Sequence, residues 1–357
     1  VVQLCLGMWS VRSMKLAIIS LSTFGYFERM ADKAIEMGVP AVFFDERPSN
    51  GFWVKFFLRA MPKSFARWFV RRHVHEQLAK IAGGGFTHAL IVFAEVYSVT
   101  DIELLKSKGI RVSRFTWDST QNRASVVELD NHMYAVGSFD PDDCSQYGYK
   151  YIPLYSEGIA PANVNSASDR SIDFYFCGTV HTDRASILHQ MQQIAEEKGW
   201  SVRWQLFFHS RFAYYLKNFR DKAALALYPQ ITSTSFPHTE ILQLSRESRI
   251  VVDIHHAKQS GLTMRSYEAL AQGAVLLTTN ERALTAITPD LADRVVYLDR
   301  ANLRASMDEA VKRTCGPLKQ EQYYELSHDR FMRQIFSLLG ITSPDDKSLQ
   351  RAARHYS

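Results

Sequence analysis

Short apolar runs alternate with helical patterns along this 357-residue chain, from Met14 to about residue 340. The runs are rich in β-branched and aromatic residues and stay apolar at consecutive positions, which is typical of parallel strands buried on both faces of a sheet. The stretches between them carry apolar residues at helical spacing. This alternation predicts an α/β fold built from doubly wound, Rossmann-like sheets.

The apolar runs form two sets. The first is KLAIIS, AVFFD, HALIVF, IRVSRFTW, MYAVGSF and YIPLY, and the second is SIDFYFCG, SVRWQLFF, IVVDIHH, AVLLTT and RVVYL. Small and polar residues fill 156–170 between the sets, as in a linker. We predict one domain over residues 14–158, a second over 170–320, and helices with a tail over 321–357. Two such domains facing each other would bind ligands in a cleft at the carboxyl ends of their strands.

Charge and cysteine content narrow the class of protein. The net charge of +5 allows an anionic ligand or a membrane surface without requiring nucleic acid. The four cysteines form no CxxC pair, which argues against a zinc site or a disulfide framework and favours a reducing compartment. No apolar run reaches the roughly 18 residues of a spanning helix. Residues 1–13 lack the basic leader of a signal peptide and are left out of the predicted fold.

The stretch SGLTMRSYEALAQG, residues 260–273, follows a predicted strand and starts a predicted helix. The free N–H groups and the positive dipole end of such a helix form a seat for phosphate. Gly261 would let the backbone approach the phosphate, Thr263 could cap the helix, and Arg265 could contact the phosphate. Glu268, one turn on, could accept hydrogen bonds from a ribose diol. In the alternative, Arg265 and Glu268 form an ordinary i,i+3 surface pair, and spacing alone does not separate the two.

The longer segment QSGLTMRSYEALAQGAVLLTTN resembles the donor-binding segment of GT-B glycosyltransferases of the group 1 and CgeB-like kind. In particular it resembles bacterial capsule and lipopolysaccharide biosynthesis proteins that carry a Q-x-G-L-T-M-R-x-x-E pattern. FFDERP, TWDS, SFDPDDCSQYGYKYIPLY and FYFCGTVHTDRASIL add to the resemblance, which covers most of residues 14–340. It implies a GT-B fold, with two Rossmann-like domains facing a cleft and a C-terminal helix packing back toward the first.

The resemblance also implies roles for single residues. Glu268 would hold the nucleotide ribose, and Arg265 would contact the diphosphate together with backbone amides. Those amides belong to Gly261, Leu262, Thr263 and Met264. Group 1 retaining enzymes often carry another glutamate eight residues before the ribose glutamate, where this chain has Ser260. The sequence therefore leaves the stereochemistry of transfer open.

Two further stretches supply candidates for the donor site. In GTVHTDR, Gly178 and Thr179 would admit a phosphate and Arg184 would neutralise it; the alternative is a strand-to-helix turn with a solvated arginine. His255 and His256 follow a strand at its carboxyl end, and we expect one of them to contact the ligand. They are poor metal ligands as a pair, because adjacent side chains on a strand point to opposite faces.

Carboxylates at the carboxyl ends of first-domain strands are the candidates for general acid or base. Asp118 is the first choice, since Trp117 beside it lowers the local dielectric, and Glu95 is the second. The alternative for Asp118 is an N-cap of the following helix. DPDD at 140–143 superficially resembles metal-binding carboxylates but fits a helix cap better, with Pro141 at the first position. We expect no metal and no cofactor, with cationic groups and helix dipoles stabilising the leaving diphosphate.

The stretch GFWVKFFLRAMPKSFARWFVRRHVHEQ mixes cations with aromatic residues and has no acidic residue before Glu76. It predicts a pair of helices, divided at Pro62, that contact an anionic membrane surface or a lipid-linked acceptor. The residues expected to make this contact are Trp53, Lys55, Arg59, Arg67 and Trp68. In the alternative the helix packs on its domain and leaves its basic face to solvent. A nucleic-acid groove is the weakest interpretation, because no recognition motif accompanies the charge.

These patterns together predict a metal-independent glycosyltransferase. It would move a sugar from a nucleotide diphosphate sugar to a saccharide or lipid-linked acceptor during bacterial capsule or lipopolysaccharide assembly. We expect it in the cytoplasm, peripherally bound to the inner face of the cytoplasmic membrane. The alternatives are a nucleotide-sugar epimerase on the same fold and a non-catalytic scaffold at the membrane that binds nucleotides or glycans.

Overall fold

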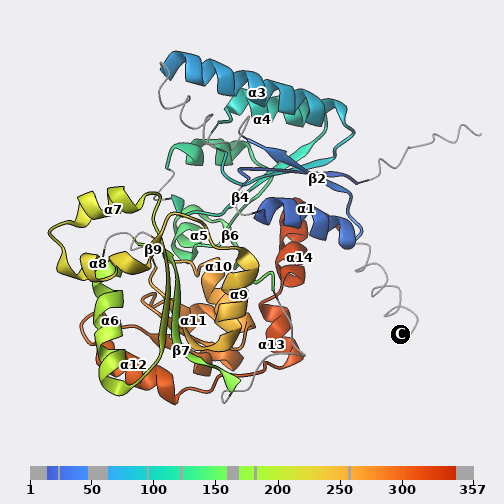
Figure 1. Ribbon diagram of the computed structural model, residues 1–357. Coiled ribbons are helices and arrows are strands. Elements are labelled where there is room, and N and C mark those ends of the chain that lie inside the picture. Colours follow the sequence, from blue (N-terminus) through green and yellow to red (C-terminus); the bar gives the residue numbers. More distant parts are fainter. Residues whose placement is uncertain are drawn as a thin grey trace, which may run out of the picture. The chain divides into compact units, whose positions relative to one another are not determined.

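The computed structural model describes residues 14–22, 25–46, 63–94, 96–120, 124–158, 169–180, 183–255 and 259–342 (Figure 1). These residues divide into two compact units. The first contains the described residues up to Ser138, Asp143–Ile152 and those from Met332 onward, and the second contains Phe139–Asp142 and Pro153–Phe331. Each unit is built on a sheet of its own.

The sheet of the first unit has six parallel strands in the order β2-β1-β3-β4-β5-β6. They are β1 (Leu16–Ser20), β2 (Ala41–Asp45), β3 (His88–Ile91), β4 (Arg111–Thr116), β5 (Val136–Ser138) and β6 (Lys150–Tyr151). The helical elements are α1 (Tyr26–Glu36), α3 (Lys63–Gly83), α4 (Val99–Ser107), η2 (Ala124–His132) and α5 (Pro141–Tyr147). The chain adds β2 on one side of β1, then crosses to the other side and adds β3, β4, β5 and β6 in order. The sheet is therefore doubly wound, as predicted.

The sheet of the second unit also has six parallel strands, in the order β12-β11-β10-β7-β8-β9. They are β7 (Ile172–Thr179), β8 (Val202–Phe207), β9 (Ile231–Thr232), β10 (Ser248–Asp253), β11 (Val275–Thr278) and β12 (Val295–Tyr297). This is the strand order of a Rossmann sheet, in which the winding reverses between the first and fourth strands. Here the reversal falls between β7 and β10.

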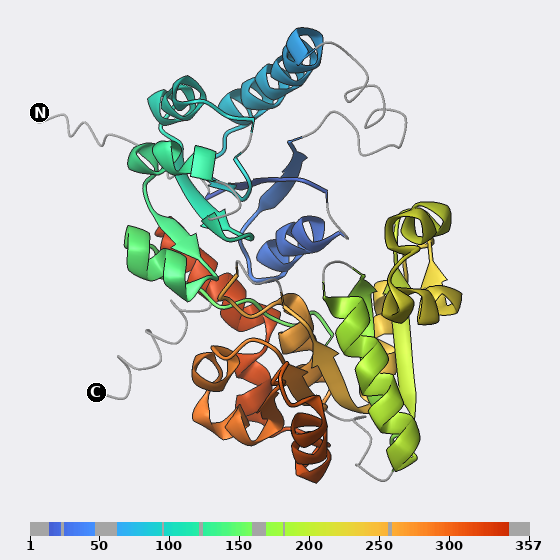
Figure 2. The same cartoon turned by 90° about the vertical axis from the view of Figure 1, so that its left-hand side faces the viewer.

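Helices cover both faces of this second sheet (Figures 1 and 2). The α-helices of this part of the chain are α6 (Arg184–Lys198), α7 (Arg211–Asn218), α8 (Lys222–Ala226), α9 (His238–Glu247), α10 (Met264–Ala271), α11 (Ala283–Ala286), α12 (Leu303–Lys312) and α13 (Gln320–Glu325), and α14 (His328–Leu339) follows them. Apolar side chains of α6, α8 and α12 form one buried cluster with those of the central strands. The parallel strands therefore carry apolar residues at consecutive positions, as their sequences indicate.

The last helix, α14, returns to the first unit. Its residues from Met332 onward belong there, and Lys150 of β6 donates a hydrogen bond to the Ser337 hydroxyl at 2.8 Å. Arg111 of β4 donates to the carbonyl of Leu339 at 3.2 Å. The predicted packing of the C-terminal helix on the first domain is confirmed. Within the described residues, no helix is both long and apolar enough to cross a membrane.

Candidate functional site

The reversal of winding in the second unit places the ends of β7 and β10 side by side. The two strands pair in parallel, and they end at Thr179 and Asp253. From these ends the chain continues to α6 and to α10, respectively. In open α/β sheets, ligands bind at such a position, outside the carboxyl ends of the strands. The candidate site is built from the residues around these two strand ends.

Asp253 is the centre of this site. It is 1% exposed, and its carboxylate accepts hydrogen bonds from Thr263 Oγ1 at 3.1 Å and Ser266 Oγ at 2.7 Å. Arg265 Nη1 donates to its other oxygen at 3.1 Å. Thr263 is the N-cap residue of α10, but its hydroxyl bonds to Asp253 and caps no amide of the helix, so the predicted position is confirmed and the predicted side-chain cap is wrong. One buried carboxylate thus fixes three side chains at the start of α10.

Arg265 lies across the ends of both strands. Its side chain is 25% exposed, and its guanidinium lies 5.4 Å from the ring centroid of Phe176. A Cβ added to Gly178 would come within 3.1 Å of Arg265 Nη2, so this glycine makes room for the guanidinium. Its expected contact with a phosphate stays a prediction. Burial opposes the charge on Arg265, but the attraction of Asp253 outweighs it and raises the pKa of the guanidinium. Arg265 therefore presents a fixed, permanent positive charge.

Glu268 is a buried carboxylate one turn further along α10. Its Oε1 lies 2.7 Å from Nε2 of His238, the first residue of α9. The other ring nitrogen of His238 lies 3.8 Å from the carboxylate of Glu157. The alternative of an Arg265–Glu268 surface pair is wrong, since each side chain has a different partner. No sequence signal pointed to His238, which is 30 residues away from Glu268.

Ser260 and Gly261 pack against a segment far away in the sequence. Ser260 N–H donates to Asp140 Oδ2 at 2.9 Å and Gly261 N–H donates to the same oxygen at 3.4 Å. A Cβ on Gly261 would lie 2.5 Å from the carbonyl oxygen of Phe139. Gly261 therefore allows close contact with the protein's own backbone, and its expected approach to a phosphate stays a prediction.

The helix start retains N–H groups beyond Gly261. None of the described residues accepts a hydrogen bond from the backbone amides of Leu262, Thr263 or Met264. Such amides, together with the positive end of the helix dipole, favour an anion. The start of α10 and Arg265 thus form a positively polarised position that favours an anion.

Asp140 is also the residue that precedes α5. Its Oδ1 accepts a hydrogen bond from the backbone N–H of Asp142 at 3.0 Å, and Pro141 is the first residue of α5. The predicted helix cap at DPDD is confirmed. The Ser260 hydroxyl also donates to this carboxylate.

Arg184 ties the two strand ends together. Its Nε and Nη2 donate to the carbonyl of Ile254 at 3.0 and 2.6 Å, and its Nη1 donates to the carbonyl of Thr179 at 2.9 Å. Burial, and then repulsion from Arg265, lower the pKa of Arg184. The alternative of a solvated arginine is wrong. Its bonded N–H groups hold the backbone, and its expected neutralisation of a phosphate stays a prediction.

His255 follows β10 and is half-buried. Its backbone N–H donates to Thr279 Oγ1 at 3.1 Å, and its ring Nδ1 lies 2.9 Å from the same oxygen. His256 lies outside the described residues. The prediction of a ligand contact by one of the two histidines stays a prediction.

The candidates of the first unit are placed in part. Asp118 is half-buried just beyond the carboxyl end of β4, and Trp117 beside it packs on Phe27 with ring centroids 5.0 Å apart. Glu95 lies outside the described residues. So do residues 121–123, so the helix-cap alternative for Asp118 stays open.

The basic and aromatic segment is described only in its last part. Trp53, Lys55, Arg59 and Pro62 lie outside the described residues, as do the side chains of Arg67 and Trp68 in α3. Further along α3, Arg71 forms an ion pair with Asp101 of α4 at 2.6 Å. At least Arg71 of this segment is therefore paired with a residue of the first unit. The predicted membrane contact of the earlier residues stays a prediction.

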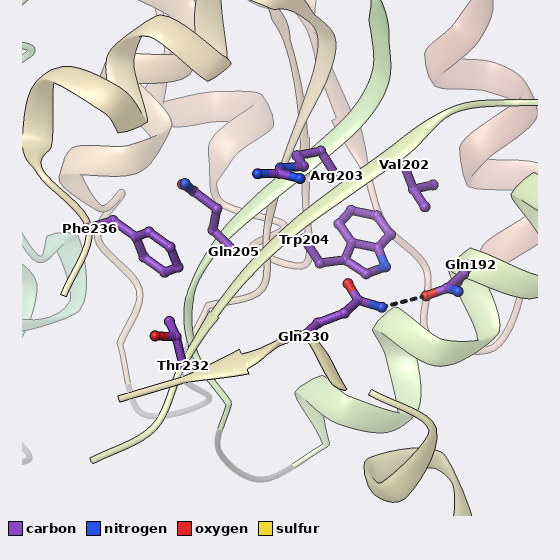
Figure 3. Close-up of a pocket in the computed structure, with 8 residues that line it drawn as sticks. All are labelled: Gln192, Val202, Arg203, Trp204, Gln205, Gln230, Thr232 and Phe236. Carbon is purple, nitrogen blue, oxygen red and sulfur yellow. Dashed lines mark hydrogen bonds between the residues drawn. The ribbon is translucent and has the colours of Figure 1, made fainter. Parts of the chain in front are cut away.

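A hollow of about 440 Å³ lies along β8, away from the candidate site (Figure 3). Its lining extends from Val202, the first residue of β8, to Thr232, the last residue of β9, and includes none of Asp253, Arg265, Glu268 and His238. Figure 3 shows Trp204 on one side of the strand and Arg203 with Gln205 on the other. Gln205 accepts a hydrogen bond from the Tyr175 hydroxyl at 2.5 Å and donates one to Glu240 at 2.5 Å. This hollow is therefore a separate feature of the second unit.

Comparisons with known proteins identify the fold. No family model matches the sequence, and no curated protein matches it. A glycosyltransferase structure from Rickettsia africae is similar with a TM-score of 0.54 and 11% identity, covering 92% of this chain and 98% of the other. A UDP-forming trehalose-phosphate synthase from Burkholderia vietnamiensis gives 0.53 and 10%, covering 91% and 97%. A UDP-GlcNAc 2-epimerase from Methanocaldococcus jannaschii gives 0.51 and 12%, covering 92% and 99%. The predicted fold, GT-B with two Rossmann-like domains, is confirmed.

Proposed function

We propose that this protein is a glycosyltransferase that takes its sugar from a nucleoside diphosphate donor. One observation carries the proposal: at the reversal point of the second sheet, Arg265 is held by the buried Asp253 beside the amides that start α10, with Glu268 one turn on. A cation and a helix start favour a diphosphate. A carboxylate at this distance along the helix suits the hydroxyl groups of a ribose.

The residues of the site have separate roles in this proposal. Arg265 and the amides of Leu262 to Met264 bind the diphosphate and stabilise the charge that develops as it leaves. Glu268 accepts a hydrogen bond from the ribose with the oxygen that His238 does not hold. Asp118 and Glu95 are the proposed acid or base residues. No metal is required, because fixed cationic groups supply the electrostatic stabilisation.

The names of similar structures support a nucleotide sugar as the donor. One of them is an epimerase solved in complex with UDP-GlcNAc and UDP, similar to this chain with a TM-score of 0.50 and 11% identity. Another is a UDP-forming synthase. These names concern those proteins, and they make a uridine nucleotide the first donor class to test here.

We further propose that the acceptor is a saccharide or a lipid-linked saccharide of bacterial capsule or lipopolysaccharide assembly, used at the inner face of the cytoplasmic membrane. The support is the resemblance of the 259–280 segment and the basic, aromatic character of residues 51–77. Charge reversal at Lys55, Arg59 and Arg67 should weaken binding to anionic vesicles. Unchanged binding would mean that this stretch is a packed helix only.

A thermal-shift screen against nucleoside diphosphates and nucleotide sugars tests the proposal. A ligand present at 100 times its dissociation constant stabilises a protein by about 2.7 kcal/mol, which such a screen detects easily. The bound nucleotide then identifies the donor for turnover assays. If no nucleotide or nucleotide sugar stabilises the protein, the proposal is wrong.

Two other functions share the same site. The similarity to UDP-GlcNAc 2-epimerase favours a nucleotide-sugar epimerase as the second candidate. Turnover of the donor to an epimer without any acceptor would establish it. A non-catalytic scaffold is the third candidate, and it predicts that Asp118→Asn and Glu95→Gln leave cellular polysaccharide unchanged.

A further inference from the structure

Helix α7 and its C-cap residue Phe219 present four large apolar side chains to solvent. They are Phe212, Tyr215, Leu216 and Phe219, with exposed fractions of 69, 46, 54 and 53%. Their spacing of three, one and three residues places them on one face of the helix. A surface helix normally turns such a stripe toward the core. A group of exposed apolar side chains of this kind marks an interaction site.

The opposite face of α7 is fixed to the second unit. Tyr214 is buried, and its ring packs on Phe208 with centroids 5.3 Å apart. Its hydroxyl donates to the carbonyl of Ala224 at 3.1 Å. The Ser210 side chain caps the helix by accepting from Ala213 N–H at 3.2 Å. These contacts set the rotation of α7, so the outward stripe is a fixed feature of the unit.

Cations surround the apolar stripe. Arg211, Lys217, Arg220 and Lys222 are all exposed, and none of them forms an ion pair with another described residue. The guanidinium groups of Arg211 and Arg220 lie 4.9 and 5.0 Å from the ring centroids of Tyr228 and Phe219. The single carboxylate of this stretch, Asp221, accepts a hydrogen bond from Ala224 N–H at 3.1 Å and caps α8. The stretch therefore joins an apolar stripe to four cations and one carboxylate.

We propose that α7 is a membrane-docking surface for anionic lipids. A bilayer surface of this kind fits both parts of the stretch, since apolar side chains enter the boundary between headgroups and acyl chains while Lys and Arg reach the phosphates. Each cation close to such a surface strengthens binding about fivefold. The proposal concerns a surface that nucleotide binding does not use, so it stands independently of the proposed glycosyl transfer.

The position of α7 gives this docking a consequence. The helix begins at Arg211, four residues after β8 ends at Phe207. The carboxyl ends of parallel strands lie at the same edge of a sheet, so α7 starts at the edge that carries Arg265. Docking through α7 brings this edge to the lipid surface. If the proposed function holds, the donor then lies at the level where a lipid-linked acceptor is presented.

Vesicle sedimentation tests the proposal with the full chain. Phosphatidylcholine vesicles containing phosphatidylglycerol should bind the wild type, and phosphatidylcholine alone should bind it far less. Lys217→Gln with Arg220→Gln should weaken binding to the anionic vesicles about 25-fold, at about fivefold for each cation. Phe212→Ser with Phe219→Ser should weaken it by about tenfold or more, because less apolar area is buried.

A matched control removes the same charge elsewhere. Arg203→Gln with Lys319→Gln alters two exposed cations of the same unit, one near the start of β8 and one at the N-cap of α13, and should bind vesicles as the wild type does. All variants should keep the wild-type melting temperature and the wild-type response to nucleotides, which separates this test from that of the proposed function. Equal binding by the α7 variants and the wild type would overturn the proposal. So would self-association in sedimentation velocity that disappears in the Phe variants while vesicle binding is absent.

Discussion

The buried residue Asp253 holds the guanidinium of Arg265 in place at the candidate site. Its carboxylate is 1% exposed and binds Thr263, Arg265 and Ser266. Removing one partner of a buried pair leaves the other without compensation. Asp253→Ala should therefore lower the free energy of unfolding by about 3–5 kcal/mol, measured by urea denaturation.

The matched control is Asp308→Ala, which breaks the exposed pair with Lys198 at 2.9 Å. This change should cost about 0–1 kcal/mol, because water screens the pair. Equal losses in the two variants would contradict the role of Asp253.

Glu268 supports a second prediction, which concerns the ribose directly. Glu268→Gln should weaken binding of a nucleoside diphosphate about tenfold, since a hydrogen bond to a charged group contributes about 1.5–3 kcal/mol and the amide retains part of it. It should have no such effect on the 2′,3′-dideoxy nucleotide, which lacks both hydroxyls. Calorimetric titration of both nucleotides into the wild type and into Glu268→Gln isolates the contribution of this contact. If the variant loses affinity equally for both nucleotides, Glu268 does not bind the ribose.

The sequence allowed part of this site to be predicted. Arg265 and Glu268 lie close together in the chain and follow a strand, so their motif was visible, although its spacing did not exclude a surface pair. The partners that exclude a surface pair lie far away in the sequence. His238 is 30 residues from Glu268, and Asp140 is 120 residues from Ser260. No local pattern encodes such contacts, because the folded sheet alone brings those segments together.

The contact between helices α3 and α4 allows a prediction about the free energy of unfolding. Asp101 of α4 accepts hydrogen bonds from Arg71 of α3 at 2.6 Å and from Ser98 N–H at 2.8 Å. Burial raises the pKa of the Asp101 carboxyl, but these hydrogen bonds outweigh it and leave the pKa below its ordinary value. Asp101→Asn should lower the free energy of unfolding by about 1–3 kcal/mol at neutral pH.

The pH dependence of this loss follows from the direction of the shift. A lowered pKa stabilises the fold fully above the ordinary aspartate pKa, and the stabilisation disappears as the pH falls through the lowered value. The wild type and Asp101→Asn should therefore converge in urea denaturation at acid pH. A difference that stays constant from neutral to acid pH would show that the ionised carboxylate is not responsible.

Strands were predicted well where apolar runs were long. KLAIIS and SIDFYFCG match β1 and β7 closely, but YIPLY contributes only Tyr151 to β6, because Pro153 lacks the N–H that a ladder needs. β9 was missed, since Ile231–Thr232 is too short for any period. The α7 stripe was missed as well, because only the burial of Tyr214 shows which face points outward.

At the scale of the whole molecule, the candidate donor site belongs to a single unit. Its residues come from β7, α6, α9, β10 and α10, and even Asp140 is part of this unit. A nucleotide would thus bind to a site that one folded unit provides. The sequence predicted two Rossmann-like domains because each has its own set of apolar runs, whereas the assignment of 139–142 to the second unit depends on contacts that only the fold creates.

Calorimetric titration of nucleoside diphosphates into the wild type, Arg265→Gln and Arg203→Gln tests whether Arg265 binds the diphosphate. Both substitutions remove one positive charge from the second unit, and Arg203 is an exposed residue of β8. We predict that at least one nucleoside diphosphate binds the wild type. Arg265→Gln should weaken that binding by about 10- to 100-fold, through loss of a charge-assisted bond, and Arg203→Gln should leave it unchanged. Wild-type protein that binds no nucleoside diphosphate, or Arg265→Gln that binds as tightly as the wild type, would show that Arg265 does not bind a diphosphate.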